Sequence, residues 1–296
     1  MENLVAWLDR IDDSAIGTLV HVGAGSGAVL EQYAALPEAR QPRQVVLIEG
    51  DPDRAHGLEH AAAKYPWARV RPTPVAAQGG SMPWNRFNLP ILNGPLDATG
   101  LTSVYPRLRR VQTTTVRFEG LADMLRSLAL EPTGKDPRVH VLVLDVPGQE
   151  ATLLAALPPE LLQQFHFLLI RGCREVLPPS GQVLKAALEL LARQHFKPVA
   201  QVDERGTLWP VALLRFDSVG HELAQLRQHA AEAAATLKER DRRLGDLQLE
   251  HEESIGQLKA QLAEANLRLE LLQQEVTRAE GQLAFLKELL LQEPSL

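Results

Sequence analysis

Short apolar runs alternate with helical patterns over residues 1–217. Continuous runs such as Val139-His-Val-Leu-Val-Leu-Asp145 are typical of parallel strands buried on both faces. We predict strands at 18–23, 44–49, 68–77, 139–145, 165–171, 198–202 and 208–216, and a return to regular structure at 113–118. Apolar positions at helical spacing predict helices at 2–13, 27–36, 121–130, 149–157 and 180–195, and one that begins after Gly50. This alternation predicts an α/β sheet wound right-handed, with a terminal antiparallel hairpin around Asp203-Glu-Arg-Gly206.

Three segments depart from a simple alternation. Residues 78–112 are rich in Gly and Pro and hold Met-Pro-Trp-Asn and Asn-Gly-Pro, so we interpret them as a long loop inserted on the substrate side. Two prolines within 68–77 predict an edge strand or an irregular one. We interpret the helix at 2–13 as a lid or cap.

Beyond Asp217 the pattern becomes that of one long helix. Its apolar residues recur at 3-4 spacing, first at Leu223, Leu226, Ala230, Ala233, Leu237, Leu244 and Leu247, and then at Leu262, Ala265, Leu269, Leu272, Val276, Ala279, Leu283, Leu286 and Leu290. The two registers join only through a stutter of about four residues near His251–Ile255. Such heptads predict a coiled-coil oligomerisation helix at 218–292, about 110 Å long, and 293–296 remain as a tail.

Two features of this helix stay open. Leucine and alanine occupy both core positions of the heptad. These residues do not specify the number of helices, so the sequence allows self-association as a dimer or a trimer. A helix that folds back on the domain at 1–217 is the alternative to a coiled coil.

Composition narrows the functional classes. A net charge of −6 and a pI near 5.9 argue against sequence-independent nucleic-acid binding. The single cysteine, Cys173, excludes a disulfide framework within the chain, and the His and Cys residues lack metal-ligand spacing, so we expect no metal. The N-terminus does not resemble a signal peptide, and no apolar run approaches the ~20 residues of a membrane helix. We therefore expect a cytoplasmic protein without direct membrane insertion.

A glycine-rich turn follows the first predicted strand. Thr18-Leu-Val-His-Val-Gly-Ala-Gly-Ser-Gly27 carries three glycines, which allow a tight turn and let a ligand lie against the backbone. The N–H groups at the start of the next helix can face an anionic or polar group. Glu49 ends the second strand, where dinucleotides and S-adenosylmethionine both need a carboxylate for ribose hydroxyls. The glycine spacing is closer than that of the dinucleotide fingerprint, which favours S-adenosylmethionine.

Five motifs in order over residues 18–216 support that choice. They are Val20-His-Val-Gly-Ala-Gly-Ser-Gly, Val46-Leu-Ile-Glu-Gly-Asp-Pro, Val75-Ala-Ala with Gly79-Gly, Thr115-Val-Arg-Phe-Glu-Gly-Leu-Ala-Asp-Met-Leu, and Leu142-Val-Leu-Asp-Val-Pro-Gly-Gln-Glu-Ala-Thr-Leu-Leu. In these motifs the chain resembles the FkbM-like methyltransferases. The resemblance implies a class I Rossmann-like fold. It also implies transfer of a methyl group from S-adenosylmethionine to an oxygen, often that of a sugar hydroxyl.

The candidate site residues follow from these motifs. We expect the cofactor to contact Gly23, Ala24, Gly25, Gly27, Glu49, Ala77 and Gln78. Asp145, at the carboxyl end of a strand, is the first candidate to orient the acceptor hydroxyl or accept its proton. Glu150 is a second candidate, or an acid that stabilises a helix N-terminus. His21 is either a catalytic group or a core histidine, and Arg171 either binds an anionic substrate or forms a structural ion pair.

Three positions at the ligand-facing edge of the predicted sheet differ from the family pattern. The family usually has an acid where His21 stands, often a Lys where Val143 stands, and Glu where Arg171 stands. The leading hypothesis is an S-adenosylmethionine-dependent O-methyltransferase that acts on a glycan or glycan precursor and is oligomerised by its coiled coil. The alternative is a non-catalytic scaffold built on a degenerate methyltransferase domain.

Overall fold

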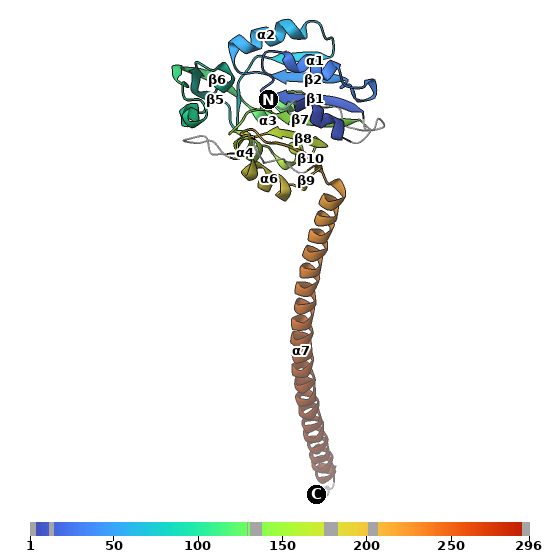
Figure 1. Cartoon of the computed structure of the whole chain (residues 1–296). Coiled ribbons are helices and arrows are strands. Elements are labelled where there is room, and N and C mark those ends of the chain that lie inside the picture. The colour runs from blue at the N-terminus through green and yellow to red at the C-terminus, as the bar shows by residue number, and fades with distance from the viewer. Residues whose placement is uncertain are drawn as a thin grey trace. The chain divides into compact units, whose positions relative to one another are not determined.

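A seven-stranded sheet forms the centre of the first part of the chain (Figure 1). The computed structural model describes residues 4–11, 15–128, 130, 138–174, 183–200 and 207–291, and the chain divides into two units, Met1–Glu222 and Leu223–Leu296. In spatial order the strands are β3 (Ala68–Arg71), β2 (Gln44–Ile48), β1 (Ile16–Val22), β7 (Val139–Leu144), β8 (Phe167–Arg171), β10 (Val211–Phe216) and β9 (Phe196–Pro198).

One strand of this sheet is reversed. β3, β2, β1, β7 and β8 run parallel, whereas β10 is antiparallel to both β8 and β9. The predicted Rossmann-like α/β sheet and its terminal antiparallel pair are therefore confirmed. The turn predicted at 203–206 lies outside the described residues.

The central strands are apolar throughout because both of their faces are covered. Alternate residues such as Leu19 and Val141 join one buried cluster, and Val20 and Leu142 join the other. The first face packs against η1 (Leu4–Arg10), α1 (Ala28–Ala34) and α2 (Pro52–Ala62). The second packs against α3 (Leu121–Ser127), α4 (Glu150–Ala155), α5 (Pro159–Leu162) and α6 (Leu184–Arg193). A short 3₁₀ helix, η2 (Glu38–Arg40), precedes β2.

The N-terminal segment corrects one prediction. The described part of 2–13 is a 3₁₀ helix that buries Leu4, Val5, Trp7 and Leu8 in the core. A lid needs a face that can leave the protein, whereas these side chains complete the packing against one face of the sheet. We conclude that η1 covers the sheet and is not a lid.

Residues 68–120 depart further from the prediction. The strand predicted at 68–77 is split into β3 and β4 (Val75–Ala76) because prolines interrupt it, as its composition suggested. The prediction of a long loop at residues 78–112 is wrong, since β5 (Gly80–Phe87) and β6 (Arg110–Gly120) pair as an antiparallel hairpin. β5 is the outer strand of the sheet β4-β6-β5 and therefore tolerates Pro83. The connection holds η3 (Pro90–Leu92) and η4 (Ala98–Ser103).

The second unit consists of the long helix α7 (Ser218–Leu291), which begins at the end of the first unit. Its 74 residues form one uninterrupted helix (Figure 1), as the heptad pattern predicts. At its start the Asp217 carboxylate accepts a hydrogen bond from the Gly220 N–H at 3.0 Å. Among the described residues, no helix combines the length and apolar character that crossing a bilayer requires.

Gly27 offers a test of the turn that joins β1 to α1. Its backbone has φ 108° and ψ −5°, and a Cβ there would lie 2.7 Å from the Ala61 Cβ. We expect Gly27→Ala to lower the free energy of unfolding by about 1–3 kcal/mol, measured by urea denaturation. Gly57→Ala, inside α2 with its nearest contact at 3.6 Å, is the matched control. It should stabilise the protein by up to about 1 kcal/mol. Equal effects of the two substitutions would contradict this account of the turn.

Candidate functional site

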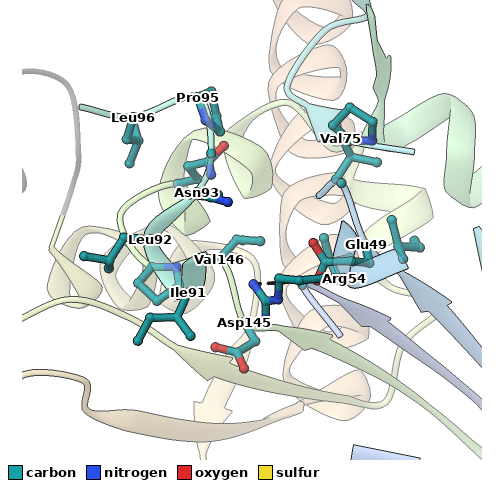
Figure 2. A pocket seen from close by; sticks show the side chains of 18 of the residues that line it. Glu49, Arg54, Val75, Ile91, Leu92, Asn93, Pro95, Leu96, Asp145 and Val146 are labelled. Atoms are coloured by element: carbon teal, nitrogen blue, oxygen red, sulfur yellow. Dashed lines mark ion pairs between the residues drawn. The ribbon is translucent and has the colours of Figure 1, made fainter. Parts of the chain in front are cut away.

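A pocket opens at the carboxyl ends of β1, β2, β7 and β8, where ligands bind in open α/β sheets. Gly23, Glu49, Asp145 and Arg171 line it from these strand ends. Further lining comes from the β5–β6 hairpin, the segment 91–98, the segment 73–75, the turn after Asp145, Arg54 of α2 and Trp209. Figure 2 shows Glu49 and Val75 on one side of the pocket and Ile91, Leu92 and Leu96 on the other. The structure therefore brings together four of the predicted site residues.

The glycine turn forms one edge of the pocket. Gly23 has φ 84°, and a Cβ at this position would lie 2.2 Å from the carbonyl oxygen of Asp145. Gly25 also has a positive φ, of 73°. The N–H groups of Gly23 and Ala24 both donate to the carbonyl of Ile48, at 2.8 and 3.1 Å. The turn is thus held against the end of β2 by its own amides.

Glu49 is the carboxylate that the sequence predicted at this place. It is 4% exposed, and its two oxygens accept hydrogen bonds from the N–H groups of Gly25 at 2.7 Å and Asp51 at 2.9 Å. Arg54 from α2 approaches the same carboxylate at 3.9 Å (Figure 2). The sequence analysis missed Arg54, because its position near the start of α2 carries no motif. These contacts fix Glu49 in one orientation at the edge of the pocket.

Asp145, at the end of β7, lines the pocket and forms an ion pair. The Arg171 Nη1 donates to its Oδ2 at 2.9 Å, and 18% of the Asp145 side chain is exposed. Burial raises the pKa of Asp145, although the positive charges of Arg171 and Arg54 oppose this shift. The two residues predicted as catalytic group and substrate anchor are therefore each other's partners in this structure.

His21 lies away from the pocket lining, on the face of the sheet that α1 covers. Its Nδ1 is 2.9 Å from the Tyr33 hydroxyl, and the side chain is fully buried. Burial, with a smaller contribution from the charge of Arg171, lowers the pKa of His21 to about 3, so the ring is neutral at neutral pH. Burial also raises the pKa of Tyr33, with the Asp145 charge as a second cause. Sequence analysis missed Tyr33, which reads as an ordinary apolar position of α1.

Glu150 also lies outside the pocket lining. Its side chain is completely buried, and both carboxylate oxygens accept from the Gly148 N–H at 3.0 Å. Burial raises its pKa to about 8, against the effect of these hydrogen bonds. Glu150 therefore lies against the turn between β7 and α4, where it accepts the Gly148 N–H close behind Asp145.

The far side of the pocket was only partly foreseen. Ala77 and Gln78 lie in the turn after β4 and are not part of the lining, whereas Val75, Trp84 and Phe118 are. The segment 91–98 closes the pocket opposite the strand ends.

Asn93 holds this segment in place. Its Nδ2 donates to the Asp51 carboxylate at 2.5 Å, and its Oδ1 accepts from the Phe87 N–H at 2.7 Å. Asp51 also caps α2 by accepting from the Asp53 N–H at 3.0 Å. The Asn-Gly-Pro motif was visible in the sequence, but its contact across to α2 was not.

Comparisons with known proteins give similarity at the level of fold. No family model matches this chain, and no curated protein matches it. The methyltransferase FkbM from Methylobacillus flagellatus is similar with a TM-score of 0.42 and 13% identity, over 69% of this chain and 44% of that chain. Precorrin-6y C5,15-methyltransferase from Geobacter metallireducens has a TM-score of 0.37 and 11% identity, over 73% and 87%.

A further similar structure, of Streptococcus pneumoniae Sp1610, is a complex with S-adenosyl-L-methionine. Its TM-score is 0.37 and its identity 14%, and the match covers 73% of each chain. This chain thus spans less than half the length of the FkbM chain and most of the length of the other two.

The buried Glu150 gives a prediction on pH. Because its folded-state pKa of about 8 lies above the ordinary glutamate value of 4.5, the folded protein holds a proton there that the unfolded chain releases. The titration of Glu150 therefore leaves the free energy of unfolding unchanged below pH 4.5, and lowers it increasingly between pH 4.5 and 8. We expect Glu150→Gln to gain stability over the wild type as pH rises from 5 to 9, measured by urea unfolding. Exposed Glu160→Gln is the control, and a difference independent of pH would contradict the prediction.

Proposed function

We propose that the first unit is an S-adenosylmethionine-dependent methyltransferase. The observation that carries the proposal is the contact between the glycine turn and the Glu49 carboxylate, at the edge of a pocket at the carboxyl end of the sheet. A fixed carboxylate beside a turn with three glycines suits a ribose, whose hydroxyls would donate to the remaining lone pairs of Glu49.

The remaining walls fit an adenosyl group better than a dinucleotide. Val75, Trp84 and Phe118 offer apolar and aromatic surface for a base. The N–H groups of Gly23 and Ala24 donate to Ile48 and that of Gly25 to Glu49, so these three amides are not available to a pyrophosphate. When bound, S-adenosylmethionine supplies a methyl group activated by a sulfonium.

We further propose that the acceptor is an oxygen, that of a sugar hydroxyl. The resemblance of the motifs to the FkbM-like family supports this choice. Asp145 faces the pocket and would accept a hydrogen bond from the acceptor hydroxyl, and its raised pKa suits a group that takes a proton as the new bond forms. The segment 91–98 would then form the acceptor side of the pocket.

A second candidate function is favoured by one observation. Among the described lining residues the carboxylates are Glu49 and Asp145, and Arg171 holds Asp145 at 2.9 Å. Arg171 stabilises the charged form of Asp145, so this carboxylate is a weaker base than an unpaired carboxylate with the same burial would be. A module that binds the cofactor as part of a scaffold, without transferring the methyl group, would show the same arrangement.

We also propose that α7 joins copies of the chain as a coiled coil. Leu226, Leu237, Leu258, Leu262 and Leu283 are all more than half exposed along one helix. Leucines at heptad spacing gain stability when a second helix covers them. The pocket does not depend on this association, because its lining lies in the first unit.

Calorimetry tests the cofactor proposal. We expect wild-type protein to bind S-adenosylmethionine and S-adenosylhomocysteine. Glu49→Gln should weaken both by about tenfold or more, because a hydrogen bond to a charged group contributes about 1.5–3 kcal/mol. Glu59→Gln, an exposed carboxylate on α2, is the control and should bind as the wild type does. Absence of binding to the wild type at millimolar ligand would refute the proposal.

Transfer of a labelled methyl group to a panel of sugars tests the role of Asp145. We expect Asp145→Asn to lower kcat by about 10²- to 10⁴-fold, as loss of a general base does, with little change in cofactor affinity. Asp123→Asn, whose side chain is 73% exposed on α3, should keep full activity. If wild-type protein binds the cofactor but methylates no acceptor, the scaffold is the better description. Full activity in Asp145→Asn would remove Asp145 from the chemistry.

A further inference from the structure

We infer that α7 pairs with the α7 of a second copy of this chain in antiparallel orientation, about a two-fold axis between Ser254 and Ile255. The inference rests on the proposed self-association and is independent of the methyltransferase activity. It follows from the position of the stutter within the helix and from the polar residues that the heptad pattern places in the seam.

The stutter lies just before the middle of the helix. α7 runs from Ser218 to Leu291, so its midpoint falls between Ser254 and Ile255. The first apolar register ends at Leu247, and the second is continuous from Ile255 and Leu258 onward. A stutter turns the apolar stripe part of the way around the helix, so each half presents its own straight seam.

An antiparallel pair about this midpoint sets apolar core positions of the first register opposite those of the second. In antiparallel pairs the first core position of a heptad on one helix faces the second core position on the other. The axis between Ser254 and Ile255 places the following residues opposite each other: Leu223 and Leu286, Leu226 and Leu283, Ala230 and Ala279, Ala233 and Val276, Leu237 and Leu272, Leu244 and Ala265, and Leu247 and Leu262. The amino half of each helix thereby meets the carboxyl half of the other, and the break in register at 248–254 of each helix faces residues 255–261 of its partner.

Arg240 distinguishes this arrangement from a parallel one. It occupies a core position of the first register, between Leu237 and Leu244. In a parallel pair in register, Arg240 would face its own copy, and two like charges would be brought together in the seam. In the antiparallel pair it faces Leu269, so its aliphatic stem can pack while the guanidinium reaches water.

The flanking charges favour neither orientation. A parallel pair sets Glu222 beside Arg227 and Glu275 beside Glu280 of the second helix, whereas the antiparallel pair sets Arg227 beside Glu280. The antiparallel pair also brings Arg243 near Arg268, at the solvent-facing flank where salt and water screen repulsion. The seam position of Arg240 therefore decides between the two orientations.

Cysteine cross-linking in the full-length chain tests the orientation. The wild type has one cysteine, Cys173, which is buried, so the wild-type protein serves as the negative control for cross-linking. Under mild oxidation we expect the double variant Leu223→Cys/Leu286→Cys to form a covalent dimer, and each single variant to stay monomeric on a denaturing gel. Ser254→Cys lies next to the axis and should cross-link in either orientation, which makes it the positive control for pairing.

Three results would overturn the inference. Covalent dimers from Leu223→Cys alone or Leu286→Cys alone would show a parallel pair. A monomer in sedimentation of the wild type, with no cross-link in Ser254→Cys, would show that α7 does not pair. A mass above that of a dimer would exclude a two-helix assembly. Calorimetry with S-adenosylmethionine on the same variants separates this test from the proposed function, since loss of cofactor binding leaves the cross-linking pattern unchanged.

Discussion

The hydrogen bond from the Gly25 N–H to the Glu49 carboxylate joins the parts on which the pocket depends. It ties the glycine turn after β1 to the end of β2 at 2.7 Å. The other oxygen of Glu49 accepts from the Asp51 N–H, at the residue that caps α2 and receives the Asn93 side chain. One buried carboxylate thus connects the turn, the second strand, the helix behind it and, through Asp51, the segment that closes the pocket.

Polar groups gather on one face of an otherwise apolar sheet. The charges of Asp145 and Arg171 lie close enough to His21 and Tyr33 to contribute to the shifts in the pKa values of these two buried groups. A neutral His21 paired with the Tyr33 hydroxyl places no charge beneath the Asp145–Arg171 ion pair. The carboxyl edge of the sheet therefore holds a charged pair open to the pocket above a neutral pair buried in the core.

The sequence allowed the main sheet to be predicted because its strands are continuous apolar runs buried on both faces. Glu49 and Asp145 were predictable for the same reason, since each directly follows such a run. The strand β5 was missed because its Gly and Pro residues indicate a loop, and only pairing with β6 shows that an outer strand accommodates them. Arg54 and Tyr33 were missed because their roles depend on contacts between helices and strand ends. The periodicity of apolar residues along the chain does not indicate such contacts.

The glycine turn is commonly taken as the part of such a fold that selects the ligand. Here three amides of the turn are already engaged, two by Ile48 and one by Glu49, which lies 24 residues away along the chain from Gly25. Evolution toward a phosphate-bearing ligand would have to release those amides by remodelling β2, even if every glycine were kept. Under the proposed function, the end of β2 therefore determines which nucleotide-like ligand the turn can bind, and the glycines only provide the space for that ligand.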